Sequence, residues 1–195
     1  PSEDGRTYLL NGTKRYITNG AIADVLTVMA RTPDGKGGTK VTAFLTTPDM
    51  PGFKVIEARA EKCGIRGTAT GKMTFTDVRV PKANVLGQLG RGLQAALTVL
   101  NFGRTTFGAT CTGHAKACVK ALCEHAKTRK QFQQPLADFQ LVQKKAAFAA
   151  AHAFAMEAMT TQCAAFIDCG ADDYMLETAI LKVFATEHLW TIVND

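Results

Sequence analysis

The fold of this chain is decided by the stretch Thr128-Arg129-Lys130-Gln131-Phe132-Gln133-Gln134-Pro135-Leu136-Ala137-Asp138-Phe139-Gln140, which lies between two long alanine-rich segments. Pro135 cannot continue a helix, because its ring fixes φ and it has no N–H to donate. The stretch therefore predicts a turn that joins two antiparallel helices of a bundle. In this turn the Arg129 guanidinium offers a planar fork of donors that suits a phosphate. The alternative is an ordinary solvated helix end, where cations complement the helix dipole.

The part of the chain before the bundle has the pattern of β-structure. Short runs of β-branched and aromatic residues alternate with turn signals up to about residue 82. Asn11-Gly12 predicts a hairpin turn, and the glycine-rich segment 34–38 predicts a loop. The expected strands are 8–10, 13–18, 25–30, 41–46 and 72–78. Short strands with no helix between them favour an antiparallel sheet or barrel.

After Pro81 the apolar residues recur at spacings of three and four, which is typical of helices. We expect helices over about 89–127, 136–167 and 174–194. A glycine suits the end of the second helix, and an aspartate suits the N-cap of the third. The sequence therefore predicts an α+β fold, an antiparallel β-barrel or sheet followed by an antiparallel helical bundle, with domains 1–85 and 86–195.

The composition of the chain indicates which kinds of ligand and partner to expect. The chain has 195 residues, 46% of them hydrophobic, and a formal net charge of +6, which suits an anionic ligand. The basic residues are dispersed, so nucleic acid is not expected as a partner. No apolar run approaches the roughly 18–20 residues that cross a bilayer. The six cysteines contain no Cys-x-x-Cys pair, which favours free thiols in a reducing compartment and no metal site.

Several motifs together resemble the acyl-CoA dehydrogenase family, most closely its very-long-chain branch. The motifs are Lys62-Cys-Gly-Ile-Arg-Gly67, Leu100-Asn-Phe-Gly-Arg104, Thr128-Arg-Lys-Gln-Phe132, Met156-Glu-Ala-Met-Thr160 and Leu176-Glu-Thr-Ala-Ile-Leu-Lys-Val-Phe184. The resemblance runs along the whole chain and implies a fragment that covers the middle β domain and the first three helices of the C-terminal domain. It implies FAD as cofactor and α,β-dehydrogenation of acyl-CoA to trans-2-enoyl-CoA in fatty acid β-oxidation.

The same resemblance implies two groups of flavin-binding residues. Tyr16-Ile17-Thr18-Asn19-Gly20 matches a family motif in which an aromatic residue, usually tryptophan, packs on the isoalloxazine and a hydroxyl bonds flavin N5. Tyr16, Ile17 and Thr18 are therefore expected FAD contacts, although the segment also fits a plain strand end before a turn. A second group is expected to reach the FAD of a neighbouring subunit: Arg129, Gln131, Phe132 and Gln140.

Substrate contacts are expected from Asn101 and Arg104, since the matching family residues touch the CoA moiety. Without the resemblance, Arg104 is one solvated arginine on a helix. Gly103 matches the catalytic glutamate of some branches, and glycine cannot abstract a proton. No catalytic residue is therefore predicted here, and the general base is expected beyond Asp195, in a Glu-Gly-Thr segment. The glycine-rich segment 87–92 fits a helix entry better than a phosphate loop.

The resemblance also implies partners. Electrons are expected to pass to electron-transfer flavoprotein, and the protein is expected to form a homodimer or a dimer of dimers, with peripheral membrane association. The expected location is the mitochondrion, matrix or inner membrane, in a eukaryote and the cytoplasm in a bacterium. Two alternatives stay open: an assembly or scaffold protein that keeps the fold, and an acyl-CoA oxidase.

Overall fold

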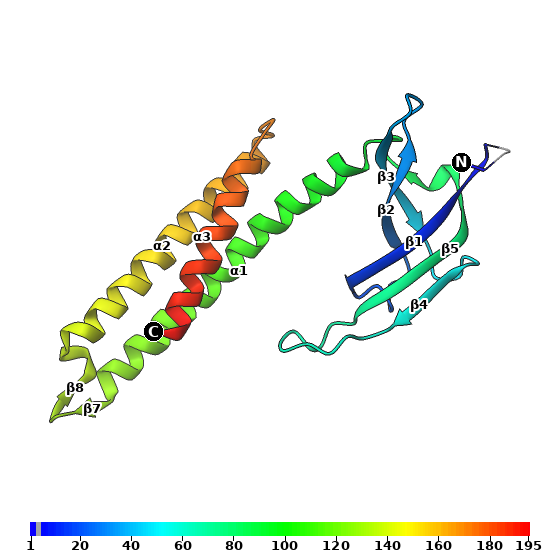
Figure 1. Ribbon diagram of the computed structural model, residues 1–195. Coiled ribbons are helices and arrows are strands. Elements are labelled where there is room, and N and C mark those ends of the chain that lie inside the picture. Colours follow the sequence, from blue (N-terminus) through cyan, green and yellow to red (C-terminus); the bar gives the residue numbers. More distant parts are fainter. Residues whose placement is uncertain (3–4) are drawn as a thin grey trace. The chain divides into compact units, whose positions relative to one another are not determined.

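The computed structural model describes residues 1–2 and 5–195, which form two compact units, residues 1–97 and 98–195 (Figure 1). The first unit holds two three-stranded sheets. Their strands are β1 (Thr7–Thr18), β2 (Leu26–Pro33), β3 (Thr39–Thr46), β4 (Phe53–Glu57), β5 (Thr70–Pro81) and β6 (Val85–Leu86), with a short 3-10 helix, η1 (Lys82–Asn84), before β6. One sheet has the order β1-β5-β4 and the other β2-β3-β6, and every pair is antiparallel.

The two sheets share an apolar core because their strands alternate buried and exposed residues, as a half-buried strand does. On β5 the pattern buries Met73, Phe75, Val78 and Val80, the central strand's inward face. Tyr8 of β1 packs against Phe44, with ring centroids 5.1 Å apart and ring planes tilted at 59°. The core residues are Tyr8, Leu10, Leu26, Val28, Phe44, Met73, Phe75, Val78 and Val80.

The hairpin predicted at Asn11-Gly12 is wrong. β1 runs through this point as one strand and pairs with β5 from Thr7 to Thr18. The register shifts between Leu10 and Gly12, where Asn11 of β1 lies opposite both Thr76 and Asp77 of β5, so β5 carries a β-bulge at this point and Asp77 takes φ of 51°. The Asn11 amide donates to Asp77 Oδ1 and its oxygen accepts the Asp77 N–H, both at 2.9 Å. These two bonds fix the Asn11 side chain across the sheet, against the backbone and side chain of Asp77.

Helix α1 (Gly92–Thr128) begins in the first unit, and the second unit is mainly helical, with one short hairpin. Its elements are β7 (Lys130–Gln131), β8 (Gln134–Pro135), the 3-10 helix η2 (Leu136–Asp138), α2 (Gln140–Asp168) and α3 (Met175–Asn194). The three predicted helices are confirmed, and so is the α+β class, while the boundary at residue 85 stays a prediction. Strand β4 lies in a segment for which the sequence predicted no strand.

The turn between α1 and α2 is a two-residue β-hairpin. Its central residues, Phe132 and Gln133, have φ of 49° and 69°, as a type I′ turn requires. After α2, Gly170 takes φ of 68°, its N–H donates to Ile167 O, and the Ala171 N–H donates to Phe166 O. This is a Schellman ending, and it explains why the glycine marks the stop. The aspartate predicted at the N-cap of the next helix is wrong, because Tyr174 holds that position; Asp173 precedes it, and its Oδ1 accepts the Met175 N–H at 3.0 Å.

The core of the helical unit is built from small residues. The buried side chains are Cys111, Ala115, Ala149, Ala153, Met156, Cys163, Leu181, Ala185 and Ile192. Thin alanine side chains let helices approach closely. At Gly108 of α1 the packing is tight, since an added Cβ would lie 2.7 Å from Leu181 Cδ2 of α3.

Candidate functional site

The end of β1 presents a segment with unusual backbone geometry. The pairing with β5 shifts register between Lys14 and Ile17, and Tyr16 takes φ of 58°. This left-handed conformation is uncommon for a bulky residue and turns its ring outward, where 66% of Tyr16 is exposed. The Arg15 guanidinium carbon lies 4.7 Å from the Tyr16 ring centroid. An exposed aromatic ring with a cation on it is a surface on which a flat ligand can pack.

Thr18 closes β1 on backbone that neighbouring residues hold in place. It pairs with Thr70 of β5, while the Ile17 carbonyl accepts the Gly20 N–H at 3.2 Å. The Asn19 side chain accepts the Ala69 N–H at 3.1 Å, which ties the turn to the start of β5. Thr18 itself is exposed, and within the described part of the chain its hydroxyl makes no hydrogen bond. The backbone that carries this donor is therefore fixed, and its hydroxyl is available to a ligand.

In the helical unit, backbone hydrogen bonds also fix the β7–β8 turn, which carries the second group of predicted flavin contacts. The Arg129 N–H donates to His125 O, and its carbonyl accepts the Leu136 N–H, both at 2.9 Å. Phe132 is 87% exposed and meets Phe139 edge to face, with ring centroids 6.3 Å apart. The side chains of Arg129, Gln131 and Gln140 are exposed and make no hydrogen bond within residues 1–2 and 5–195. An exposed guanidinium without a carboxylate partner fits an anionic ligand.

The two predicted substrate residues lie side by side on α1, but they differ in exposure. Asn101 is buried, and its Oδ1 accepts from Arg104 Nη1 at 3.1 Å and from the Thr178 hydroxyl of α3 at 3.5 Å. Arg104 is half-buried, so part of its guanidinium faces solvent. In this geometry Asn101 orients the arginine. Gly103 lies between them in sequence, and a Cβ added to it would meet no other part of the described chain within 4 Å beyond its own helix backbone and chain neighbours.

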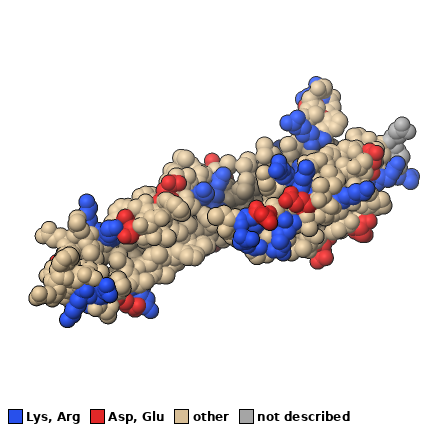
Figure 2. All heavy atoms as spheres, turned by 60° about the horizontal axis from the view of Figure 1, so that its bottom comes forward, with Lys and Arg blue, Asp and Glu red and all other residues tan. Residues whose placement is uncertain are grey.

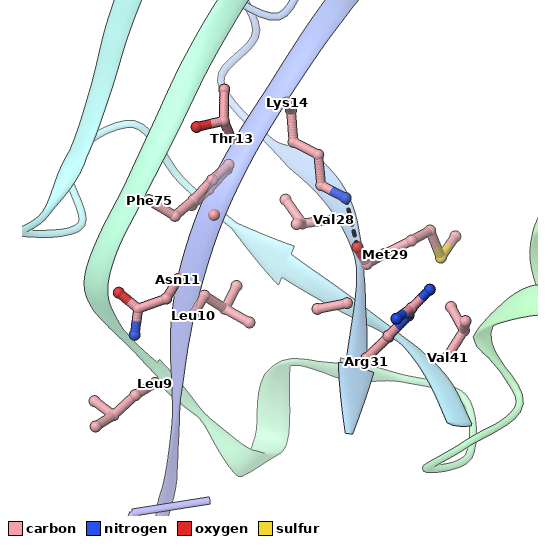
Figure 3. A pocket seen from close by; sticks show the side chains of 12 residues that line it. Leu9, Leu10, Asn11, Thr13, Lys14, Val28, Met29, Arg31, Val41 and Phe75 are labelled. Atoms are coloured by element: carbon pink, nitrogen blue, oxygen red, sulfur yellow. Dashed lines mark hydrogen bonds between the residues drawn. The ribbon is translucent and has the colours of Figure 1, made fainter. Parts of the chain in front are cut away.

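The first unit also contains a cavity of about 510 Å³ along β1 and β2. Leu10, Val28 and Phe75 line it, and Lys14 Nζ donates to the Met29 carbonyl at 2.7 Å beside it (Figure 3). None of the site residues predicted from the sequence lines this cavity. The sequence carries no signal for it, because it depends on how strands distant in sequence are placed.

The surface charges and the pKa shifts of the described residues do not point to a different kind of site. Lys and Arg side chains are scattered over the face in Figure 2, with Asp and Glu among them. Burial raises the pKa of the Cys111 and Cys163 thiols. Among the described residues, no cluster of three or more His, Cys, Asp or Glu side chains could hold a metal ion. None of the helices described combines the length and apolar character needed to cross a membrane.

Comparison with known proteins gives matches along both units. Residues 1–78 match the profile of the acyl-CoA dehydrogenase middle domain, and residues 90–195 match the acyl-CoA dehydrogenase C-terminal domain. The chain is 36% identical to the very long-chain specific acyl-CoA dehydrogenase, mitochondrial, of Rattus norvegicus. That match covers 100% of this chain and 30% of the relative.

Solved structures of the same class share the fold. The butyryl-CoA dehydrogenase of Megasphaera elsdenii matches with a TM-score of 0.88 and 34% identity, over 99% of this chain and 50% of that one. An acyl-CoA dehydrogenase of Bacillus anthracis, solved in complex with FAD, matches with a TM-score of 0.82 and 31% identity, over 99% of this chain and 35% of that one. The chain therefore spans from about a third to half of the length of these relatives.

Proposed function

Because this chain belongs to the acyl-CoA dehydrogenase family, we propose that the protein it forms part of dehydrogenates acyl-CoA thioesters to trans-2-enoyl-CoA with FAD. The observation that carries the proposal is the Thr18 hydroxyl, which is exposed and unbonded at the end of a strand whose backbone is fixed on both sides. When bound, FAD supplies a hydride acceptor at its N5 atom.

In the β unit, Thr18 would donate its hydroxyl hydrogen to N5. A donor that is already in position stabilises charge developing on its partner without reorganising during the reaction. Tyr16 would offer its exposed ring to the isoalloxazine, and Ile17 would pack beside it. The ring of Tyr16 is smaller than the tryptophan usual in the family, so the stacked area is smaller as well.

In the helical unit, Arg129 would hold the pyrophosphate of the FAD of a neighbouring subunit. Its forked donors can bind two phosphate oxygens at once. Gln131 and Gln140 would add amide contacts, and Phe132 would offer an exposed ring. This assignment makes the flavin site complete only in an oligomer, a homodimer or a dimer of dimers.

Arg104 would contact the CoA end of the substrate from its half-buried position, with Asn101 orienting it. The α-proton would go to a glutamate outside residues 1–195, since Gly103 has no side chain. Electron-transfer flavoprotein is the proposed electron acceptor. The proposed location is mitochondrial in a eukaryote and cytoplasmic in a bacterium.

Replacement of Thr18 by alanine tests the proposal. The loss of a donor aimed at developing charge lowers rates by up to about 10²–10³-fold. We expect Thr18→Ala to slow single-turnover flavin reduction by acyl-CoA while the protein stays folded. Thr13→Ala is the matched control, because Thr13 is another exposed threonine of β1. Equal reduction rates in both variants would remove Thr18 from the site.

Two further measurements separate the alternatives. A scaffold protein would leave its flavin oxidised when acyl-CoA is added anaerobically, whereas a dehydrogenase would reduce it. An oxidase would release hydrogen peroxide in air at the rate of turnover.

A further inference from the structure

The ammonium group of Lys62 lies in a cage of neutral oxygen atoms. Lys62 Nζ donates to the Thr68 carbonyl at 3.2 Å, to the Thr68 hydroxyl at 2.5 Å and to the Thr70 hydroxyl at 2.8 Å. These three acceptors match the three hydrogens of an ammonium group. Lys62 is half-buried and belongs to none of the salt bridges found in the described residues. Its positive charge is therefore held in place without a counter-charge.

This cage lies next to the candidate flavin contact. Thr70 is the residue of β5 that faces Thr18 of β1 in the register of the sheet. Residues directly opposite each other in an antiparallel pair point to the same face, with Cβ atoms about 4.5–5.5 Å apart. The Thr18 hydroxyl and the Thr70 hydroxyl therefore share one face of the sheet, and Lys62 donates to the second of them.

A purely structural role for Lys62 would be to pin the loop of residues 58–69 between β4 and β5. Other hydrogen bonds already hold that loop in place. The Ala60 N–H donates to the Thr70 carbonyl at 2.7 Å, which closes its base. Arg59 Nη1 donates to the carbonyls of Arg66 and Gly67 at 3.0 and 3.3 Å, which bind its tip. Pinning alone does not explain why a cation is held on the face of Thr18.

We propose that Lys62 is a positioning residue of the flavin site, which fixes the Thr70 hydroxyl beside Thr18 and supplies positive potential to a bound flavin. A fixed positive charge favours the reduced form, because reduction adds negative charge to the ring system. The inference rests on the proposed function, since it assumes that Thr18 faces flavin.

The test is the midpoint potential of the FAD bound to the full-length protein, measured by equilibration with a reference dye. Lys62→Gln keeps a donor for the threonine oxygens but removes the charge. We expect Lys62→Gln to lower the ratio of reduced to oxidised flavin at fixed potential about tenfold. This corresponds to a midpoint potential lower by about 30 mV for a two-electron couple. Lys62→Met should show the same shift, and Lys62→Arg should keep most of the wild-type potential.

Two controls separate charge from loop pinning. Thr68→Val removes one acceptor of the cage but leaves the ammonium, so the ratio of reduced to oxidised flavin at fixed potential should stay within threefold of the wild-type ratio. Lys36→Met removes an exposed lysine of the β2–β3 loop and should change nothing. The inference is overturned if Lys62→Gln matches Lys36→Met, or if Thr68→Val shifts the potential as far as Lys62→Gln.

The same protein samples distinguish this failure from failure of the proposed function. If FAD binds and Thr18→Ala slows its reduction, but Lys62→Gln leaves the potential unchanged, only the role of Lys62 is wrong. If the wild-type protein binds no FAD, or Thr18→Ala behaves as Thr13→Ala does, the flavin assignment of this face is wrong and the inference falls with it.

Discussion

Replacement of Gly108 by alanine should destabilise the helical unit, although alanine is the better helix former. The new Cβ would lie 2.7, 2.8 and 2.9 Å from Cδ2, Cγ and Cδ1 of Leu181. Leu181 is fully buried, so it has no free space into which to turn. Overpacking of this kind costs about 1–3 kcal/mol, and the glycine-to-alanine exchange returns about 1 kcal/mol of helix propensity. Because all three contacts are too short, we expect a net loss of about 1–2 kcal/mol.

Gly113 provides a control on the same helix. Apart from the two neighbouring residues and the nearby backbone of the helix itself, no atom of the described residues lies within 4 Å of the Cβ that alanine would add there. Gly113→Ala should therefore stabilise α1 by about 0.5–1 kcal/mol, through helix propensity and a less flexible unfolded chain. Equilibrium urea unfolding measures both changes. Trp190 of α3 is the single tryptophan of the chain, so its fluorescence reports on this unit.

The double variant Gly108→Ala, Leu181→Ala tests the assigned contact. Leu181→Ala alone should cost about 2–5 kcal/mol, since it empties a buried site. If the new methyl group occupies that space, the double variant should lose less than the sum of the single losses, with a coupling of at least about 1 kcal/mol. Additive losses, or a Gly108→Ala protein as stable as Gly113→Ala, would refute the close approach of α1 and α3.

Two other predictions concern assembly and thiol chemistry. Arg129→Ala should stay folded and lose part of its FAD on gel filtration, because each charged hydrogen bond contributes about 1.5–3 kcal/mol and other contacts remain. Arg129→Lys should recover only part of the FAD content. A monomer with full flavin occupancy would contradict the cross-subunit site. Iodoacetamide at pH 8 should alkylate the exposed Cys63 and Cys169 well before the buried Cys111 and Cys163. Burial raises the pKa of the two buried thiols, so at this pH they carry less thiolate than an ordinary thiol does. Mass spectrometry of the peptides measures the labelling, and equal labelling of all four cysteines in the native protein would contradict the prediction.

The sequence was a good guide where structure depends on local chemistry. Pro135 and the helical spacing placed the turn between α1 and α2, and Gly170 marked the end of α2 because only a residue free to adopt positive φ completes a Schellman ending. It was a poor guide where a local signal had a distant partner. Asn11-Gly12 carries the strongest short-range hairpin signal, yet it lies inside a continuous strand, where Asn11 hydrogen-bonds to Asp77, 66 residues away, in a bulge of β5.

The residues of the candidate site also differ in whether the local sequence indicates them. Motifs pointed to Tyr16, Thr18 and Arg129 because each belongs to a compact run of residues. The cage around Lys62 could not be predicted, since it forms only when the loop 58–69 folds back on the start of β5. The burial of Asn101 against α3 depends in the same way on helix packing that its neighbours in sequence do not reveal.

A common principle distinguishes residues presented to a ligand from residues that build the fold. At the end of β1 and in the β7–β8 turn, backbone groups make the hydrogen bonds that hold the chain, and the side chains of Thr18 and Arg129 make none within the described residues. Asn101 shows the opposite use, since its side-chain oxygen is occupied between two partners. Where an exposed polar side chain lies on mobile backbone, a ligand must order both the backbone and the side chain, and this ordering is costly. Here the backbone is already fixed, by strand pairing in one unit and by a hairpin in the other. A ligand that binds Thr18 or Arg129 therefore has only a side-chain rotation to restrict, and this preorganisation is what a binding site requires.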